Sequence, residues 1–455
     1  MERKGFLKSL FDVRPNERRI AALMCGYFFL VITSFWILKP IKKTLFIQHY
    51  AQSGFDFGGT LYSASEAELF AKVLNMLVAA AAAAIFGILA SRMRREQLTY
   101  VFSAFFIVLY GVFAFLLASP ASAAVWSFYL FGDLFSTIMV ATFFSFLNDS
   151  VNSDAAKRLY GLVGFGGVAG GAFGSTIVAL WIDRYETATW LFLTAVIAAI
   201  IVLLARAASR ALPDYAEDTP APEASLASDA PNTPSAETNE GGSAALRGAR
   251  LVFGSSYLLS IVAIVGVYEL VSTLVDYQFT TSIVAFSEDA AQRSQNFATV
   301  YAASNWLAMF VQLFLTSFIM RRFGMTTALL VLPCSIAMAS AGFLLAPTLL
   351  LGGMLSVSDN GFSYSLNQSA KEALYVPTTV EEKYQAKAFI DMFVQRFAKA
   401  LGVGLSLLVT RFFSDSEDIG RLTLFVLPLL AIWMFAALTA GRRFRDRTAS
   451  ESTHV

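Results

Sequence analysis

Cysteine, histidine and charged residues are all scarce in this chain of 455 residues. Its two cysteines, Cys25 and Cys334, each lie inside an apolar segment, which fits buried small side chains better than a disulfide or a metal pair. The two histidines, His49 and His454, are too few and too far apart for a zinc site. We therefore expect no metal and no cofactor. Enzymatic catalysis is the least favoured function, because no nucleophile–base pair stands out.

Apolar residues take the place of the missing charges. Hydrophobic residues make up 56% of the chain and charged residues 15%, and the mean hydropathy of +0.59 is outside the range of soluble domains. This composition predicts an all-α polytopic membrane protein. The net charge of +1 is uninformative, because the placement of charge matters more than its sum in such a chain. We expect no nucleic-acid partner.

Apolar stretches of about 20 residues, long enough to cross a hydrocarbon core, occur twelve times. They lie near 20–47, 66–90, 98–118, 122–148, 157–181, 189–209, 251–284, 294–320, 326–346, 348–374, 386–411 and 419–440. The arrangement is six plus six. It predicts two pseudo-symmetric six-helix domains, 20–211 and 251–440.

The segment 212–250 between the two sets of spans is rich in Ala, Ser, Pro, Glu and Asp, which predicts a disordered linker. Basic residues near the span ends gather on the face that also holds the N-terminal segment 1–19 and the tail 441–455. We therefore expect this face to be cytoplasmic, in a bacterial inner membrane, and the protein to be a monomer. The first span lacks a cleavage site and is expected to be its own insertion signal.

Three lysines at the far end of the first span, Lys39, Lys42 and Lys43, break this charge pattern. Their spacing puts them on one helical face. Burying a lysine at membrane depth costs roughly 2.5–3.5 kcal/mol, so such a face usually lines a binding site. Snorkelling to the outer interface is the alternative. We favour a phosphate or carboxylate clamp, with Pro40 interrupting the hydrogen bonding of the helix so that the cluster can face inward.

Charged residues inside other spans are further candidates. Asp133 lies within the fourth span, where it should pair with a lysine, carry a proton or stay protonated in a structural hydrogen bond. Glu269 and Asp276 share a face of the seventh span and suit ion coupling or a switching salt bridge between the halves.

Two later spans and the start of the fifth carry more charge. The residues are Lys371 and Glu372 at the end of span ten, Asp391, Arg396 and Lys399 in span eleven, and Lys157 and Arg158 before span five. Arg396 and Lys399 form a second cationic face that would complete a two-sided anion clamp. The alternative is a cytoplasmic gate in which Lys371, Glu372, Asp391 and Arg396 pair with each other and with the two basic residues before span five.

A glycine-rich run, Gly164–Gly174, has the glycine content of a nucleotide-binding loop. It lacks the Gly-Lys-Ser/Thr ending, and no strand precedes it. Its small residues recur every four positions, at Gly166, Gly170 and Gly174, which favours close packing between helices.

Four segments, 156–166, 370–377, 386–391 and 396–399, resemble the nucleotide transporter family, the ATP/ADP translocases of plastids and intracellular bacteria, within a major facilitator architecture. The resemblance covers both halves and implies transport roles for Lys42, Asp133 and Lys371. The span-seven glutamate of that family falls on Ser272, and Lys43 stands where the family usually has an acid.

The sequence therefore predicts a secondary transporter that moves a nucleotide or related organic phosphate by alternating access. Because no ATP-hydrolysing motif is present, exchange or an ion gradient must supply the energy. Two alternatives stay open. One is proton-coupled transport of a non-nucleotide anion, such as a carboxylate, a sugar phosphate or a lipid headgroup. The other is a non-transporting sensor with the same fold. The expected partners are the anionic solute and the lipid bilayer.

Overall fold

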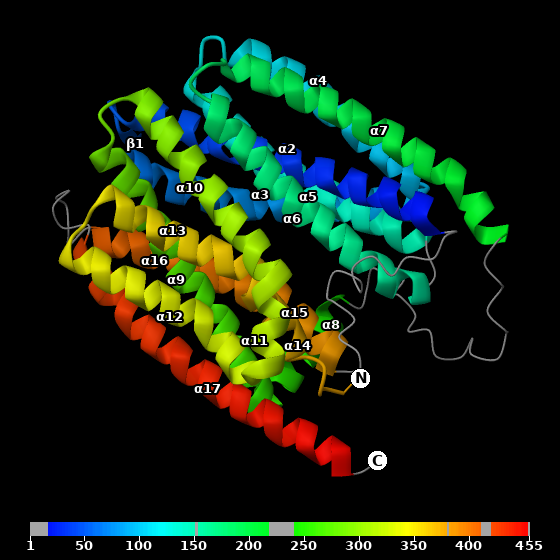
Figure 1. The fold of residues 1–455 in the computed structure, drawn as a ribbon. Coiled ribbons are helices and arrows are strands. Elements are labelled where there is room, and N and C mark those ends of the chain that lie inside the picture. Colours follow the sequence, from blue (N-terminus) through cyan, green and yellow to red (C-terminus); the bar gives the residue numbers. More distant parts are fainter. Residues whose placement is uncertain (1–16, 151–152, 218–240, 380–381, 411–419, 454–455) are drawn as a thin grey trace. The chain divides into compact units, whose positions relative to one another are not determined.

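The computed structural model describes residues 17–150, 153–217, 241–379, 382–410 and 420–453 and is almost wholly helical (Figure 1). A short antiparallel hairpin of β1 (Phe55–Phe57) and β2 (Thr60–Tyr62) interrupts the helices near the start. Gly58 and Gly59 form its turn with φ angles of 63° and 77°, which glycine adopts without steric cost.

The chain divides into two compact units, each with its own hydrophobic core. The first unit comprises Met1–Ala224 and Glu288–Ala302. The second comprises Ser225–Ser287 and Ala303–Val455. The beginning of helix α10 (Ala290–Phe310) therefore groups with the first unit although it follows the linker in sequence.

The other helices of the first unit are α2 (Arg18–Tyr50), α3 (Ala64–Arg92), α4 (Arg95–Leu116), α5 (Ser122–Ser150), α6 (Ser153–Trp181) and α7 (Thr187–Glu217). Helix α2 packs along α5, α6 and α7, as Figure 1 shows for α5 and α6. A capping box begins α3, because Ser63 and Glu66 each accept the other's backbone N–H.

The glycine run of α6 packs against α2, as the sequence predicted. A Cβ atom at Gly170 would lie 2.3 Å from the carbonyl oxygen of Phe29, and one at Gly174 would lie 2.6 Å from that of Thr33. The backbones of the two helices therefore approach more closely than any larger residue would allow.

The second unit contains α8 (Gly241–Gly254), α9 (Ser256–Phe286), the rest of α10, η2 (Val311–Leu315), α11 (Thr316–Arg322), α12 (Gly324–Leu345), α13 (Leu349–Phe362), η3 (Ser363–Asn367), α14 (Gln368–Ala373), η4 (Glu382–Ala386), α15 (Lys387–Phe389), η5 (Ile390–Val394), α16 (Gln395–Thr410) and α17 (Thr423–Thr453). Helix α9 packs against α13, α16 and α17, and α17 runs along α12 (Figure 1). The η segments are π-helical turns, which are frequent at functional sites.

Among the described residues, eleven helices are long and apolar enough to cross a membrane. The tenth of the twelve predicted spans, 348–374, is missing from these eleven, although its residues form α13, η3 and α14. The reason is its polarity, because it carries Asp359, Lys371 and Glu372 among many serines and asparagines.

Helices extend into both ends of the predicted linker. Helix α7 continues to Glu217 and α8 begins at Gly241, so 212–217 and 241–250 are helical, and 218–240 lies outside the described residues. The predicted seventh span also begins too early. The helix breaks at Ser255, whose side chain caps α9 by accepting the N–H of Leu258 at 3.4 Å.

The two cysteines are free thiols. Cys25 is half-buried and donates to the carbonyl oxygen of Leu162 at 3.5 Å. Cys334 is exposed, so the expectation that both would be buried was wrong for this residue. Its segment was read correctly as apolar, but apolar residues of a membrane helix also face outward.

Candidate functional site

Lys42 of α2 forms a salt bridge with Asp133 of α5 inside the first unit. The Lys42 ammonium also donates to the carbonyl oxygen of Tyr129 at 3.4 Å and lies 4.5 Å from the centroid of that ring. Asn75 of α3 donates a 2.9 Å hydrogen bond to the other Asp133 oxygen. The expectation that Asp133 pairs with a lysine is confirmed.

Gly132 makes room for this salt bridge. A Cβ atom at this position would lie 2.6 Å from Cδ of Lys42, so a larger residue would displace the lysine. The Lys42 side chain is 5% exposed. Burial at this depth makes the carboxylate necessary, because an ammonium group without a counter-charge is costly in a low-dielectric interior.

Glu68 of α3 forms a second buried ion-pair group beside the first. Its carboxylate oxygen Oε1 lies 3.2 Å from Lys43 Nζ and 3.9 Å from Lys72 Nζ, and its side chain is 2% exposed. The Tyr129 hydroxyl donates to the same oxygen at 3.0 Å. Tyr129 therefore contacts both groups, through its hydroxyl to Glu68 and through its ring and carbonyl to Lys42.

Lys39 has a third environment. Its ammonium lies 4.4 Å from the ring centroid of Trp36 and 4.8 Å from that of Tyr301, which belongs to α10. These are cation–π contacts. The three lysines of α2 thus face three different surroundings. Helix α2 continues through Pro40, which removes one backbone donor from its hydrogen bonding, as expected.

We call these residues the lysine cluster. It consists of Lys39, Lys42, Lys43, Lys72, Glu68 and Asp133. Glu68 and Lys72 were missed in the sequence, as were the supporting residues Asn75 and Tyr129. The rule that singled out Asp133 would have found Glu68 and Lys72, since both are charged residues inside an apolar segment.

Two buried carboxylates occupy the second unit. Glu269 of α9 is 7% exposed and accepts a 2.7 Å hydrogen bond from Gln395. Asp359 of α13 is 4% exposed and accepts a 2.7 Å hydrogen bond from Ser272, one turn beyond Glu269 on α9. Asp359 was not singled out in the sequence, although it too is a charged residue within a predicted span.

Other predicted residues of the second unit lie nearby. Tyr364 lies close enough to four charged residues to interact electrostatically with them, namely Asp359, Lys399, Asp276 and Glu269. Asp276 is half-buried on α9, and Lys399 is exposed on α16. Arg396, one turn before Lys399, is exposed as well, so the predicted cationic face of α16 is accessible.

The predicted gate residues pair differently from the expectation. Glu372 forms an ion pair with Lys387 at 2.5 Å rather than with Lys371. Asp391 interacts electrostatically with three of its neighbours: Lys371 and Lys387 attract its carboxylate, and Glu372 repels it. The side chains of Lys157 and Arg158 lie outside the described residues, so their part in a gate stays a prediction.

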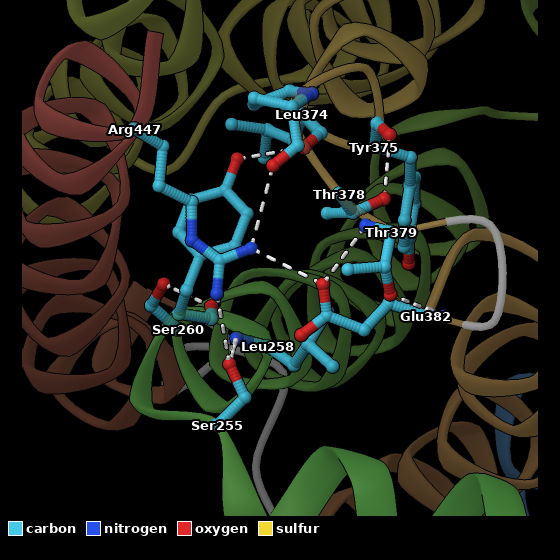
Figure 2. A network of polar contacts seen from close by, with 11 residues as sticks. Ser255, Leu258, Ser260, Leu374, Tyr375, Thr378, Thr379, Glu382 and Arg447 are labelled. Carbon is cyan, nitrogen blue, oxygen red and sulfur yellow. Dashed lines mark hydrogen bonds and ion pairs between the residues drawn. The ribbon is translucent and has the colours of Figure 1, made fainter. Parts of the chain in front are cut away.

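A further polar network in the second unit is centred on Arg447 of α17 (Figure 2). Its guanidinium donates to Glu382 at 3.2 Å, to the carbonyl oxygen of Pro377 at 3.4 Å and to Ser255 at 3.4 Å. It also lies 4.5 Å from the ring centroid of Tyr257. One side chain thereby joins α17 to the start of α9 and to the segment before η4.

Family models match most of the chain. The Major Facilitator Superfamily model matches residues 23–389, and the TLC ATP/ADP transporter model matches residues 344–444. The resemblance to nucleotide transporters that the motifs indicated is thus confirmed for the C-terminal part of the chain.

Curated relatives are more distant. ADP,ATP carrier protein 1 of Chlamydia trachomatis is 24% identical over 173 residues, which cover 33% of this chain and 32% of that protein. The matches span less than half the length of the chlamydial carriers. The plastidic ATP/ADP-transporter of Solanum tuberosum is 21% identical, with 93% of this chain and 73% of that protein covered.

Solved structures share the fold. The nucleoside transporter NupG superimposes with a TM-score of 0.61 at 15% identity, covering 92% of this chain and 98% of that one. PepTSo, a transporter of the POT family, superimposes with a TM-score of 0.61 at 13% identity, covering 95% of this chain and 98% of that one. At this identity the likeness shows a major-facilitator-like helical fold.

Proposed function

We propose that this chain, which belongs to the Major Facilitator Superfamily, moves a nucleotide or a related organic phosphate across a membrane by alternating access. The match of residues 344–444 to the TLC ATP/ADP transporter model supports a nucleotide as the solute. The observation that carries the proposal is the lysine cluster, in which buried lysines gather around two carboxylates inside an integral membrane protein.

Electrostatics explains why such a cluster suits a phosphate. Ammonium groups in a low-dielectric interior attract an anion much more strongly than they would in water. The free-energy cost of removing water from these ammonium groups is part of folding. A phosphate that binds them is therefore attracted by their charge without an additional cost for their desolvation. Charged residues at membrane depth commonly mark a substrate or ion pathway.

The proposal gives each residue a role. Lys42, Lys43 and Lys39 of the first unit would contact the solute's phosphates, with Asp133 as the counter-ion of Lys42. In the second unit the basic residues Lys371, Arg396 and Lys399 would add contacts to the anion. Ion coupling or gating would fall to Glu269, Asp276, Glu372 and Asp391, and to Lys157 and Arg158.

Counter-exchange or an ion gradient would supply the energy. We place the protein in a bacterial inner membrane with both termini in the cytoplasm, because the basic loops follow the positive-inside pattern. No enzymatic activity is part of the proposal.

Uptake into proteoliposomes tests this function. Vesicles loaded with ATP should take up labelled ADP through the wild-type protein, whereas Lys42→Ala should lose most of the flux. Lys383→Ala is the matched control, because Lys383 is an exposed lysine outside the cluster. Absence of flux with every nucleotide and organic phosphate, under exchange and under imposed gradients, would overturn the proposal.

Ion-coupled transport of a non-nucleotide anion is the second candidate. It is favoured by Glu269, because Gln395, which donates a hydrogen bond to it, carries no charge. A buried carboxylate held by a neutral donor suits proton uptake. Uptake of a carboxylate or a sugar phosphate that depends on a proton gradient, with no response to nucleotides, would select this candidate.

A further inference from the structure

Glu68 is held by more donors than an ordinary helix-surface carboxylate. Lys43, Lys72 and the hydroxyl group of Tyr129 converge on its oxygen Oε1 at 3.2, 3.9 and 3.0 Å. These donors come from α2, α3 and α5, and the side chain of Glu68 is 2% exposed. Two ammonium groups and a hydroxyl group around one anionic oxygen are also the contacts that a phosphoryl oxygen would make.

Stability alone is a weak reason for this arrangement. Desolvation of a buried ion pair offsets most of its Coulombic gain, and an apolar replacement of similar volume is often as stable. Buried charges in membrane helices tend to serve transport instead. A carboxylate that holds two lysines also competes with any anion that needs those lysines.

The neighbouring ion pair has the same form. Asp133 holds Lys42 as Glu68 holds Lys43, and the two lysines are consecutive on α2. Tyr129 contacts both groups. Two carboxylates thus bind the ammonium groups of the adjacent residues Lys42 and Lys43. Two linked phosphoryl groups would bind the same two ammonium groups.

On the basis of the proposed function, we propose that Glu68 is a resident counter-anion that the substrate displaces. Its carboxylate holds Lys43 and Lys72. When substrate binds, one phosphoryl group takes these contacts while another takes those of Lys42. The site therefore favours a solute with at least two linked phosphates over a monophosphate, because a monophosphate replaces one carboxylate and leaves the other in place.

Glu68→Gln tests this role by removing the competing charge. Isothermal titration of the purified protein should show ADP binding about tenfold or more tightly, which corresponds to ~1.4 kcal/mol of competing interaction. The affinity for AMP should rise less, so the preference for ADP over AMP should increase. A merely structural role would lower the stability of the protein without changing this preference.

Glu66→Gln is the matched control, because Glu66 precedes Glu68 on the same helix and serves the capping box. It should bind ADP as the wild type does. Glu68→Asp is the second variant, in case Glu68→Gln does not fold. It keeps the charge but shortens the side chain, and it should tighten ADP binding to a smaller extent.

The outcomes separate this inference from the function on which it rests. Equal or weaker ADP binding by every Glu68 variant that folds, beside normal binding by the wild type and Glu66→Gln, would overturn the counter-anion role and leave the proposed function intact. If the wild type and the variants all fail to bind ADP, AMP and pyrophosphate, the proposed function falls, and this inference falls with it.

Discussion

Ser272 donates a hydrogen bond of 2.7 Å to the carboxylate of Asp359, which joins the first and fourth membrane helices of the second unit. The corresponding helices of the first unit are joined by Lys42 and Asp133. The first and fourth membrane helices are therefore joined by an ion pair in one unit and by a hydrogen bond from a hydroxyl group to a carboxylate in the other. This difference leads to the first prediction.

Removing the carboxylate of Asp133 in the first unit should lower the free energy of unfolding more than removing the hydroxyl group of Ser272 in the second unit. Asp133→Ala leaves the Lys42 ammonium buried without its counter-ion, and we expect a loss of about 3–5 kcal/mol in the free energy of unfolding. Ser272→Ala removes one hydrogen bond to a charged group, at a cost of roughly 1–3 kcal/mol. Unfolding transitions of both variants in the same detergent measure the difference, and equal losses would contradict it.

The contact between α6 and α2 depends on small residues. Gly170→Val would force a side chain against the carbonyl oxygen of Phe29, 2.3 Å from the Cβ position, so we expect destabilisation of at least about 1–3 kcal/mol. Gly164→Ala is the control, since no described atom beyond the adjacent residues and backbone of its own helix lies within 4 Å of its Cβ position. It should be neutral or slightly stabilising. Thermal unfolding checks the pair, and similar losses in both would refute close packing.

Arg447 should hold the segment before η4. Arg447→Ala removes the hydrogen bonds to Glu382, to the Pro377 carbonyl and to Ser255, so amide exchange should become faster in residues 374–379. Arg445→Ala, an exposed arginine on the same helix, should leave the exchange unchanged. Hydrogen–deuterium exchange by mass spectrometry compares the two. Unchanged protection in Arg447→Ala would show that this network does not order the segment.

Asp183, in the turn between α6 and α7, gives a pH prediction. Although Asp183 is exposed, partial desolvation by its neighbours raises the pKa of its carboxyl group, and the nearby charge of Asp289 raises it further. Because this pKa is higher in the folded state than in the unfolded state, the folded protein binds the proton more tightly. Proton binding therefore contributes to stability at low pH, and this contribution is lost as the pH rises through the folded-state pKa. Asp183→Asn should therefore melt higher than the wild type at neutral pH, by a small amount because Asp183 is exposed.

This advantage of Asp183→Asn should shrink as the pH is lowered toward the ordinary aspartate pKa near 3.8. Melting temperatures of both proteins across that range supply the measurement. An advantage that stays constant with pH would contradict the repulsion between Asp183 and Asp289.

Hydropathy was enough to predict the helical membrane fold. A helix must satisfy its own backbone in lipid, so an apolar run of the right length has few other structures available to it. The tenth span shows where this rule weakens. Its residues form helices, but polar side chains around Asp359 lower its mean hydropathy. Asp359 is buried inside the unit and does not face lipid, so a helix in this position tolerates polar side chains.

The ion pairs could be predicted only in part. For Asp133, pairing with a lysine was one of three alternatives that energetics allowed, and the sequence did not say which lysine it would be. The partner of Lys43 did not follow. Glu68 begins the second span, and only the packing of α3 beside α2 brings it within 3.2 Å of that lysine. Pairing between helices depends on their rotation and register, and one sequence does not specify either.

The measurement that tests the central claim most directly is the thermal unfolding of the purified wild type and Lys42→Ala with ADP or adenosine, two ligands that share a base and a sugar. A ligand that binds the folded state raises its stability in proportion to the logarithm of its concentration above Kd. We predict that ADP raises the melting temperature of the wild type, that adenosine does not, and that Lys42→Ala loses most of the ADP response. An equal rise with adenosine, or a full ADP response in Lys42→Ala, would contradict recognition of the solute's phosphates by the lysine cluster.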